Sequence, residues 1–255
     1  MFQLDQAGYS LPEKVLLHPT SVEFHAAGIY GLIGHNGSGK STLLKLLAGH
    51  LKATSGRVDF DGQAVARWPQ RRFAREIAYL PQHLPPSEHL TALELIQFGR
   101  YPWQGLLGRA SAQDKAAVDR AIELTQTQAY RHQRVDTLSG GERQRVWLAM
   151  LLAQNSRFLL LDEPLAPLDI AHQTEVLALI HRLSRELGLG IMLVLHDINQ
   201  AARYCDQLVA LGGGRIIASG APAEIMTSAQ LQHIYGTDMS IVSHPRLGIP
   251  VALAN

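Results

Sequence analysis

The strongest chemical signal in the sequence is a glycine-rich segment at residues 34–42. It fits the spacing G-x-x-x-x-G-K-[ST], with an apolar run before it and a leucine-rich helical pattern after it. Glycines let backbone N–H groups converge on phosphate oxygens, and a helix start adds partial positive charge at the same place. We therefore expect Lys40 to contact the β- and γ-phosphates of a nucleotide and Ser41 to bind Mg²⁺. The residues of this P-loop are Gly34, His35, Asn36, Gly37, Ser38, Gly39, Lys40, Ser41 and Thr42.

An acidic pair, Asp162 and Glu163, directly follows the apolar run at residues 158–161. A strand buried on both faces would bring Asp162 to its carboxyl end, where we expect it to bind Mg²⁺. Glu163 is then placed to polarise an attacking water as the general base. Such a dipeptide alone often only opens a loop, but the P-loop favours the catalytic interpretation.

Two further apolar runs end in polar residues, Gln82 and His196. Ligands of open α/β sheets gather at the carboxyl ends of strands, so we expect both side chains to converge with the acidic pair on one γ-phosphate. Gln82 would contact the metal and the water, and His196 would donate a hydrogen bond to the phosphate. Each residue taken singly also fits a solvated position at a strand end, and the convergence favours the functional interpretation.

A second segment that suits a phosphate begins at Ser139 and continues through Gly140 and Gly141 to Glu142. The spacing of Ser139 and Glu142 predicts a capping box at a helix start. Capping does not explain the two glycines, because each costs a helix on the order of 1 kcal/mol relative to alanine. Exposed N–H groups at this helix start would suit a second phosphate site.

The elements that must position these residues follow from the hydrophobic pattern. Residues 22–24 and 58–60 alternate between apolar and polar, which predicts a half-buried antiparallel β layer. Residues 77–80, 158–161 and 191–195 are continuously apolar, as in parallel strands buried on both faces. Helical patterns separate these runs and predict an α/β core with a mostly parallel sheet.

The middle of the chain, residues 87–153, lacks a convincing strand pattern and has three helix-start signatures. They are Thr91 with Glu94, Ser111 with Asp114, and Ser139 with Glu142, so we predict a helical insert.

Near the carboxyl end, residues 212–214 predict a tight turn between strands at residues 207–211 and 215–219. A short helical pattern at residues 223–235 and a loose tail should follow.

Composition limits the class of protein. The chain has 255 residues, 46% hydrophobic, with 23 basic and 22 acidic side chains, which excludes general disorder and leaves no overall charge to attract nucleic acid. The Arg67, Arg71, Arg72 and Arg75 cluster is a local exception that we interpret as a solvated helix face.

A single cysteine indicates a reducing compartment. We expect neither a signal peptide nor a membrane span, so any membrane association would come through a partner.

Taken in order, the P-loop, Gln82, the Ser-Gly-Gly segment, the acidic pair, Asp169 and His196 resemble the ATP-binding-cassette (ABC) ATPases. The resemblance implies a P-loop NTPase fold with a mostly parallel core sheet, an N-terminal antiparallel β layer and a helical subdomain insert. The implied division is a single ABC ATPase domain over 1–255, with a RecA-like core and β layer at 1–86 and 156–220, a helical subdomain at 87–155, and a C-terminal helix and tail at 221–255.

In that family two copies associate head to tail, and each ATP lies between the P-loop of one copy and the Ser-Gly-Gly segment of the other. The resemblance thus implies that Ser139, Gly140, Gly141 and Asp169 contact nucleotide in a homodimer. It also assigns an aromatic residue near the N-terminus to adenine stacking. Tyr9 is the best-placed candidate, with an ordinary surface or core tyrosine as the alternative.

A single ATPase domain in the chain resembles the separate ATPase subunit of a bacterial importer. The segment at 98–103 is similar to ATPases that drive uptake of iron chelates and cobalamin. Residues 99–103, 107–109 and 169–173 look most like ferric hydroxamate siderophore importers. For Tyr101 and Trp103, local packing around Pro102 is the alternative to a partner contact.

The implied assembly is a homodimer on the cytoplasmic face of the inner membrane, docked on permease subunits and served by a periplasmic or surface substrate-binding protein. Its cofactors would be ATP and Mg²⁺, and nucleic acid is not an expected partner. An importer of cobalamin, haem or another metal chelate is the alternative. A non-transport ABC ATPase of DNA repair or translation is a more remote alternative, and a binding module with a vestigial P-loop is a third.

One segment departs from the family pattern, because Leu165, Ala166 and Pro167 stand where the family commonly has Thr or Ser, then Ser, then Ala, before Leu168 and Asp169. A hydroxyl lost at Ala166 removes a group that helps to couple the two copies, and Pro167 stiffens the loop. We predict altered coupling without loss of hydrolysis.

Overall fold

The computed structural model describes residues 1–87, 89–104, 108–166 and 168–255, which divide between two compact units. The first unit consists of Met1–Trp68 and Gly190–Asn255, and the second of Pro69–Leu189. Predictions that involve Leu107 and Pro167 fall outside the described residues. The finer division into core, helical subdomain and C-terminal region remains a prediction.

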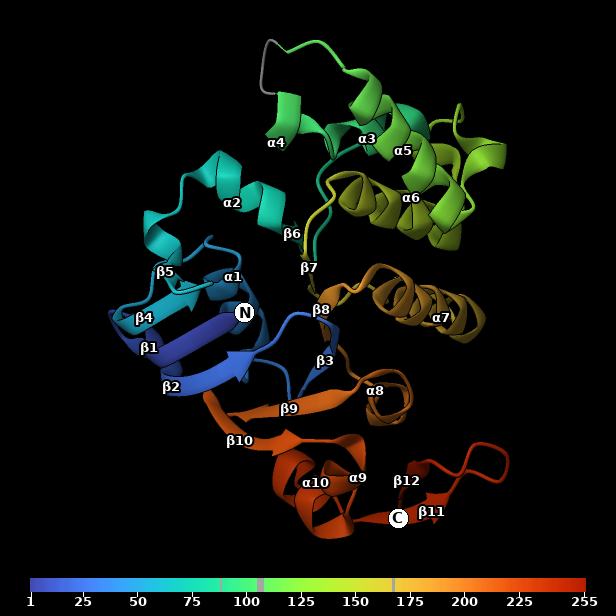
Figure 1. Ribbon diagram of the computed structural model, residues 1–255. Helices are drawn as coiled ribbons and strands as arrows, with labels where there is room; N and C mark the ends of the chain where they lie inside the picture. Colours follow the sequence, from blue (N-terminus) through green and yellow to red (C-terminus); the bar gives the residue numbers. More distant parts are fainter. Residues whose placement is uncertain (88, 105–107, 167) are drawn as a thin grey trace. The chain divides into compact units, whose positions relative to one another are not determined.

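An antiparallel sheet forms the N-terminal layer of the first unit (Figure 1). Its strands lie in the order β2 (Lys14–Phe24), β1 (Phe2–Leu11), β4 (Ser55–Phe60) and β5 (Gln63–Ala64). The register pairs Phe2 with both Phe24 and Phe60, and all three rings are buried. The Phe2 and Phe60 ring centroids lie 4.8 Å apart. Alternating apolar side chains therefore cover one face of this sheet, as the sequence predicts.

Parallel strands form the core of the first unit, where β3 pairs in parallel with β8 and with β9. β10 is antiparallel to β9, and Gly213 and Gly214 turn the chain between them with φ of 54° and 74°. Positive φ at both central residues is the requirement of a type I′ hairpin turn. The predicted tight turn is confirmed, although Gly212 itself remains in β9.

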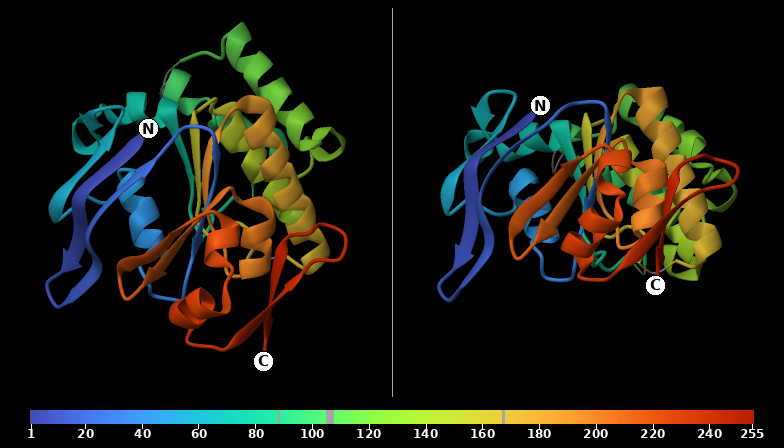
Figure 2. Two further views of the ribbon diagram at one scale, coloured as in Figure 1. Left: turned by 60° about the horizontal axis from the view of Figure 1, so that its bottom comes forward. Right: turned by 90° about the horizontal axis from the view of Figure 1, so that it is seen from below.

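The C-terminal region differs from the sequence prediction. The single helical pattern is divided into two short helices, and the expected loose tail contains the antiparallel hairpin β11–β12 (Figure 2). The Asn199 amide of α8 holds this hairpin by donating to the Ala252 carbonyl at 3.0 Å and accepting from the Ala252 N–H at 2.7 Å. Because that anchor lies far away in sequence, local pattern did not indicate it.

The elements of the first unit, in chain order, are as follows: β1 (Phe2–Leu11), β2 (Lys14–Phe24), β3 (Gly28–Ile33), α1 (Lys40–Leu47), β4 (Ser55–Phe60), β5 (Gln63–Ala64), the 3₁₀ turn η1 (Val65–Arg67), β8 (Gly190–Val194), α8 (Ile198–Tyr204), β9 (Gln207–Gly212), β10 (Arg215–Gly220), α9 (Pro222–Ile225), α10 (Ser228–Tyr235), β11 (Met239–Ser243) and β12 (Pro250–Ala254).

Helices dominate the second unit, where α6 packs against α3, α5 and α7 (Figure 1). Each of the three predicted capping boxes is present, at the starts of α3, α5 and α6. The parallel strands β6 (Ile77–Leu80) and β7 (Phe158–Leu161) also belong to this unit. Within the described part of residues 87–153 there is no strand beyond an isolated bridge between Thr91 and Arg134, so the predicted helical insert is confirmed.

The arginine cluster is not the simple solvated face that the sequence suggested. Arg71 Nε and Arg75 Nε of α2 both donate to the Pro102 carbonyl, at 2.9 and 3.0 Å. Arg75 also lies over the Trp103 ring, 4.6 Å from its centroid. These arginines therefore hold α4 against α2, because guanidinium groups combine fixed donors with a face that stacks on aromatic rings.

The elements of the second unit, in chain order, are as follows: α2 (Gln70–Glu76), β6 (Ile77–Leu80), α3 (Ala92–Phe98), α4 (Tyr101–Gln104), α5 (Ala112–Thr125), the 3₁₀ turns η2 (Gln128–Tyr130) and η3 (Val135–Thr137), α6 (Gly140–Ala153), β7 (Phe158–Leu161) and α7 (Ile170–Leu187).

None of the helices in the described residues combines the length and the apolar character needed to cross a bilayer.

Candidate functional site

The P-loop joins β3 to α1 and folds around its own lysine. Lys40 is only 5% exposed, and its Nζ donates to the carbonyls of Gly34 at 2.7 Å and His35 at 2.8 Å. Gly34 adopts a φ of 129°, and a Cβ there would lie 2.1 Å from the Leu211 carbonyl oxygen, so only glycine fits. The main chain at Leu211 therefore leaves no room for a side chain at Gly34.

Several features of the P-loop suit an anion. The residue that precedes α1 is Gly39, which has no side chain to cap the first N–H groups. The Ser38 hydroxyl is buried and has no hydrogen-bond partner among the described residues. A helix start without a side-chain cap, a buried ammonium and an unsatisfied hydroxyl together form a site that a phosphate would complete.

Asp162 lies at the carboxyl end of β7, where its side chain is 1% exposed. Tyr79 Oη donates to Asp162 Oδ2 at 3.3 Å. Burial, reinforced by the Asp162 charge, raises the pKa of Tyr79 far above its usual value, which further favours the neutral phenol that donates to Asp162. Sequence reasoning missed Tyr79, and the only available signal was a polar atom inside an otherwise apolar strand.

Gln82 and Glu163 are brought together, with Gln82 Nε2 donating to Glu163 Oε2 at 2.8 Å. Glu163 adopts a φ of 51°, in the left-handed region that a residue with a Cβ seldom occupies. Backbone strain of this kind is typical of functional loops. The contact supports the expectation that the glutamine and the proposed general base act at one place.

His196 follows β8 in the first unit and is exposed. The next residue, Asp197, caps α8 by accepting from the backbone N–H groups of Asn199 and Gln200. Leu195 N donates to the Leu32 carbonyl at 3.1 Å, which ties the segment to the P-loop strand β3. Convergence of His196 with the acidic pair stays a prediction.

The candidate metal ligands are all oxygen atoms. The described residues contain no cluster of three or more histidine, cysteine, aspartate or glutamate side chains that could hold a metal. Mg²⁺ seldom needs such a cage, because it binds one or two protein oxygens and completes its octahedron with water and substrate phosphates. Ser41, Gln82 and Asp162 offer the hard donors that this ion prefers, and their role as ligands stays a prediction.

The Ser-Gly-Gly segment forms the start of α6. Glu142 Oε2 accepts from the Ser139 backbone N at 2.9 Å and from its Oγ at 2.7 Å, and Ser139 Oγ accepts in turn from Glu142 N. These bonds hold the pKa of the Glu142 carboxyl below its usual value. Gly140 is exposed and Gly141 is buried, as the first two residues of the helix.

Two other predicted contacts are placed as follows. Asp169 is the exposed N-cap of α7, where Oδ1 accepts from His172 N at 2.9 Å. Tyr9 is a half-buried residue of β1 that pairs with Leu17 of β2. The position of Tyr9 is compatible with both alternatives, so its role in adenine stacking stays a prediction.

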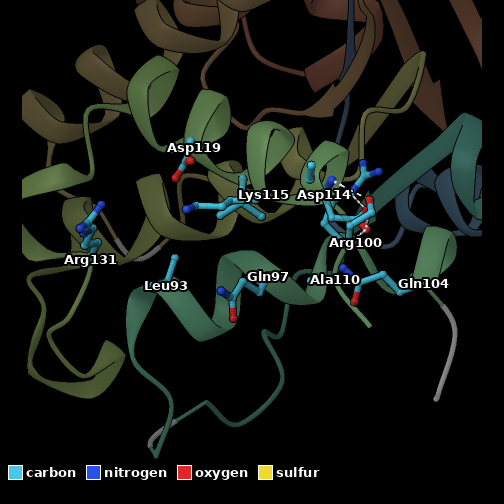
Figure 3. A pocket seen from close by; sticks show the side chains of 12 residues that line it. Leu93, Gln97, Arg100, Gln104, Ala110, Asp114, Lys115, Asp119 and Arg131 are labelled. Carbon is cyan, nitrogen blue, oxygen red and sulfur yellow. Dashed lines mark hydrogen bonds and ion pairs between the residues drawn. The ribbon is translucent and has the colours of Figure 1, made fainter. Parts of the chain in front are cut away.

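The second unit also contains a cavity of about 500 Å³ between α3 and α5 (Figure 3). Arg100 and Asp114 meet at its edge with Nε and Oδ1 2.8 Å apart, and each residue is 6% exposed. Arg100 Nη1 also donates to the Ala153 carbonyl at 2.8 Å. The Arg100 guanidinium therefore ties α5 to the end of α6.

The family model of the ABC transporters matches residues 17–166, and the chain belongs to this family and is one of its ATPases. The α/β fold with its P-loop, parallel strands and antiparallel layer confirms the predicted fold class. The achromobactin transport ATP-binding protein CbrD of Dickeya dadantii is 46% identical over 96% of this chain and 91% of its own length. The petrobactin import protein FpuC of Bacillus anthracis is 42% identical over 94% and 89%.

The iron(3+)-hydroxamate import protein FhuC of Bacillus subtilis is 39% identical over 98% of this chain and 93% of its own length. Among solved structures, CbiO1 of Clostridium perfringens is similar with a TM-score of 0.79 and 26% identity, over 91% of this chain and 92% of that one. The dimeric cassette MJ0796 bound to ADP and phosphate gives a TM-score of 0.74 with 25% identity, over 87% and 99%.

Proposed function

We propose that this chain is the ATP-hydrolysing subunit of a bacterial ABC importer that takes up a ferric siderophore of the hydroxamate type. The supporting observation is that relatives 39–46% identical over nearly the whole chain are named for petrobactin import, iron(3+)-hydroxamate import and achromobactin transport. Haem is a substrate alternative with its own support, because the hemin import protein HmuV of Bordetella avium is 37% identical over 91% of both chains. Cobalamin and other metal chelates remain further alternatives.

The working unit is a homodimer in which each nucleotide lies between two copies. The dimeric MJ0796 cassette supports this arrangement. The P-loop of one copy holds the phosphates, and Ser139, Gly140, Gly141 and Asp169 of the other copy complete the site. ATP favours closure because it gains contacts that exist only when the second copy is present.

Hydrolysis proceeds by in-line attack of water on the γ-phosphate. Lys40 neutralises charge on the phosphates, Glu163 accepts a proton from the water, and His196 donates a hydrogen bond to the γ-phosphate. Gln82, whose amide donates to Glu163 in the structure, would contact the metal and the attacking water when both are bound. Ser41, Gln82 and Asp162 would hold Mg²⁺, which would supply positive charge to the phosphates when bound.

A groove in the second unit supports docking on a permease. It has a volume of about 410 Å³ and is lined by the end of β6, the proline-rich segment after it, Phe98 and Trp147. Phe98 and Tyr101 are 55% and 50% exposed. Trp103, by contrast, is held locally, since its Nε1 donates to the Gln154 carbonyl at 2.7 Å. Phe98 and Tyr101 are therefore the aromatic residues that we assign to the partner contact.

In the proposed assembly the chain lies on the cytoplasmic face of the inner membrane as a peripheral subunit. A periplasmic or surface substrate-binding protein delivers the chelate to the permease. Purification from detergent-solubilised membranes tests this arrangement, because only an importer subunit should be recovered with a polytopic membrane partner. Recovery without one would favour a non-transport ATPase.

The catalytic assignment is tested by Glu163→Gln. The amide keeps the size of the side chain and loses the base, so we expect turnover to fall by about 10²–10⁴-fold while ATP still binds. Steady-state phosphate release and a titration with labelled ATP measure the two quantities. Sedimentation should detect a stalled, ATP-dependent dimer. Hydrolysis at the parent rate would contradict the role of Glu163.

A further inference from the structure

The first turn of α7 contains a histidine, His172, that the proposed reaction does not use. Its ring Nδ1 lies 2.8 Å from Asp169 Oδ1, the oxygen that also accepts from the His172 backbone N–H at 2.9 Å. Hydrogen bonds from His172 lower the pKa of the Asp169 carboxyl, so this group is ionised and accepts only. Nδ1 must therefore carry a proton, which fixes how the ring is turned.

The opposite edge of the same ring meets the Ser-Gly-Gly segment. A Cβ on Gly141 would lie 2.5 Å from His172 Cδ2, closer than a Cβ atom approaches another heavy atom, and 3.3 Å from Nε2. The absence of a Cβ at Gly141 thus allows the His172 ring to lie directly against the first turn of α6. Capping alone does not explain Gly141, because a glycine costs the helix about 1 kcal/mol relative to alanine. The close approach of the His172 ring does explain it.

The ring therefore joins two segments that are both assigned to the nucleotide of the second copy. One contact runs to the Asp169 cap of α7, and the other runs to Gly141, one residue before Glu142 in the capping box. His172 is 45% exposed, and the Asp169 side chain is 68% exposed, so both lie at the surface where a partner would approach.

We propose that His172 is a positioning residue that fixes the Ser-Gly-Gly segment relative to Asp169, so that the two present one rigid surface to the nucleotide of a second copy. This inference rests on the proposed head-to-tail site. His172 itself need not touch the nucleotide. Its effect should appear only when two copies associate, because the P-loop of the same chain does not depend on this contact.

A matched control exists on the same two helices. Arg145 of α6 and Glu175 of α7 form an ion pair at 3.1 Å, further along both helices and away from the two segments. The Glu175 side chain is 58% exposed. If His172 acted only by packing α7 against α6, loss of the Arg145–Glu175 pair should weaken dimerisation as much as loss of His172. If His172 positions the Ser-Gly-Gly segment, loss of the ion pair should have little effect.

The experiment compares His172→Ala, His172→Asn and Glu175→Gln in the full chain. ATP-dependent dimerisation is measured by sedimentation in a Glu163→Gln background, and kcat is measured in the unaltered background. Affinity for a fluorescent ATP analogue is measured at a dilution where the chain is monomeric. We expect His172→Ala to weaken dimerisation and lower kcat by about tenfold, the effect of one hydrogen bond to a charged group.

His172→Asn keeps a donor near Nδ1 and a planar group beside Gly141, so it should stay within about threefold of the parent. Glu175→Gln should stay within about twofold, as expected for an exposed ion pair. Monomer affinity for the analogue should stay unchanged in all three variants. Parent-like dimerisation of His172→Ala, or an equal loss in Glu175→Gln, would overturn the inference.

A second pair of variants tests the contact itself. Gly141→Ala should lower the stability of the monomer to chemical denaturation, and adding His172→Ala should remove part of that loss because the new methyl group then has space. No recovery in the double variant would contradict the contact. If the Glu163→Gln parent itself fails to dimerise with ATP, the proposed head-to-tail site is wrong. If the parent dimerises and His172→Ala dimerises equally well, only the positioning role of His172 is wrong.

Discussion

Two helix starts in this molecule, those of α1 and α6, carry the glycines assigned to phosphate binding, and they are built differently. α1 begins after Gly39, which has no side chain to satisfy the first N–H groups. α6 begins after Ser139, whose hydroxyl accepts from Glu142 N while Glu142 bonds back to Ser139. The start of α1 has no side-chain cap and carries a buried lysine, whereas the start of α6 is capped by its own residues.

The difference has a thermodynamic consequence. An uncapped helix start costs stability until an anion satisfies its N–H groups, so the P-loop is suited to hold phosphate without a partner. A capped start is stable alone and offers only the N–H groups of Gly140 and Gly141. We infer that α1 provides affinity for nucleotide, and that α6 contributes recognition only when another copy supplies the phosphate.

The largest expected effect is that of Lys40→Ala. Removal of the buried ammonium should weaken ATP binding by about 1,000-fold, which corresponds to about 4 kcal/mol. Titration with labelled ATP measures this change. The control is Lys45→Ala, which removes an exposed lysine from the same helix and should leave affinity unchanged. Equal losses in both variants would mean that helix charge, and not the P-loop contact, holds the nucleotide.

The next effect concerns a capped helix of the second unit, α5. Burial alone would raise the pKa of Asp114, but hydrogen bonds from Ser111 and the Arg100 guanidinium outweigh it and lower the pKa to about 2 (Figure 3). A carboxyl of lowered pKa contributes stability that is complete above its unfolded value of about 3.9 and is lost as the pH falls toward 2.

Asp114→Asn should therefore lower the free energy of unfolding by about 3 kcal/mol at neutral pH, since it leaves Arg100 buried without its charged partner. Its stability should also fall less steeply than that of the parent between pH 4 and pH 2. Chemical denaturation across this range provides the measurement. Asp119→Asn, an exposed change on the same helix, serves as the control. Parallel pH profiles for Asp114→Asn and the parent would show that the ion pair contributes nothing.

A smaller effect distinguishes the two roles of the α6 cap. Ser139→Ala should cost about 1 kcal/mol of stability, and Ser111→Ala at the start of α5 should cost a similar amount. Only Ser139→Ala should also weaken ATP-dependent dimerisation. If the two variants dimerise equally well, capping is the whole function of Ser139, and the comparison between α1 and α6 loses its basis.

The smallest effect is expected at Ala166, an exposed residue of the segment between β7 and α7. Restoring a hydroxyl with Ala166→Ser should change coupling between the two sites by on the order of 0.5 kcal/mol while hydrolysis continues. The Hill coefficient of ATPase activity reports this change. An identical coefficient in parent and variant would argue against a coupling role for this position.

Short-range patterns in the sequence determined much of this protein. The P-loop spacing, the three capping boxes and the Gly213–Gly214 turn each depend on residues within a few positions of one another, so local chemistry specifies them. Continuous apolar runs likewise predicted β6, β7 and β8. These local features are sufficient to identify the fold class and the phosphate-binding loop without knowledge of how the helices and strands pack.

Only the tertiary structure decided which distant side chains meet. Gln82 bonds Glu163 and Tyr79 bonds Asp162 across more than 80 residues of sequence. Arg71 and Arg75 hold α4 although their spacing indicated a solvated face, and Asn199 anchors a hairpin where a loose tail was expected. His172 lies against Gly141 for the same reason. Such contacts depend on how whole elements pack, and a pattern that repeats every two or four residues carries no information about a partner far along the chain.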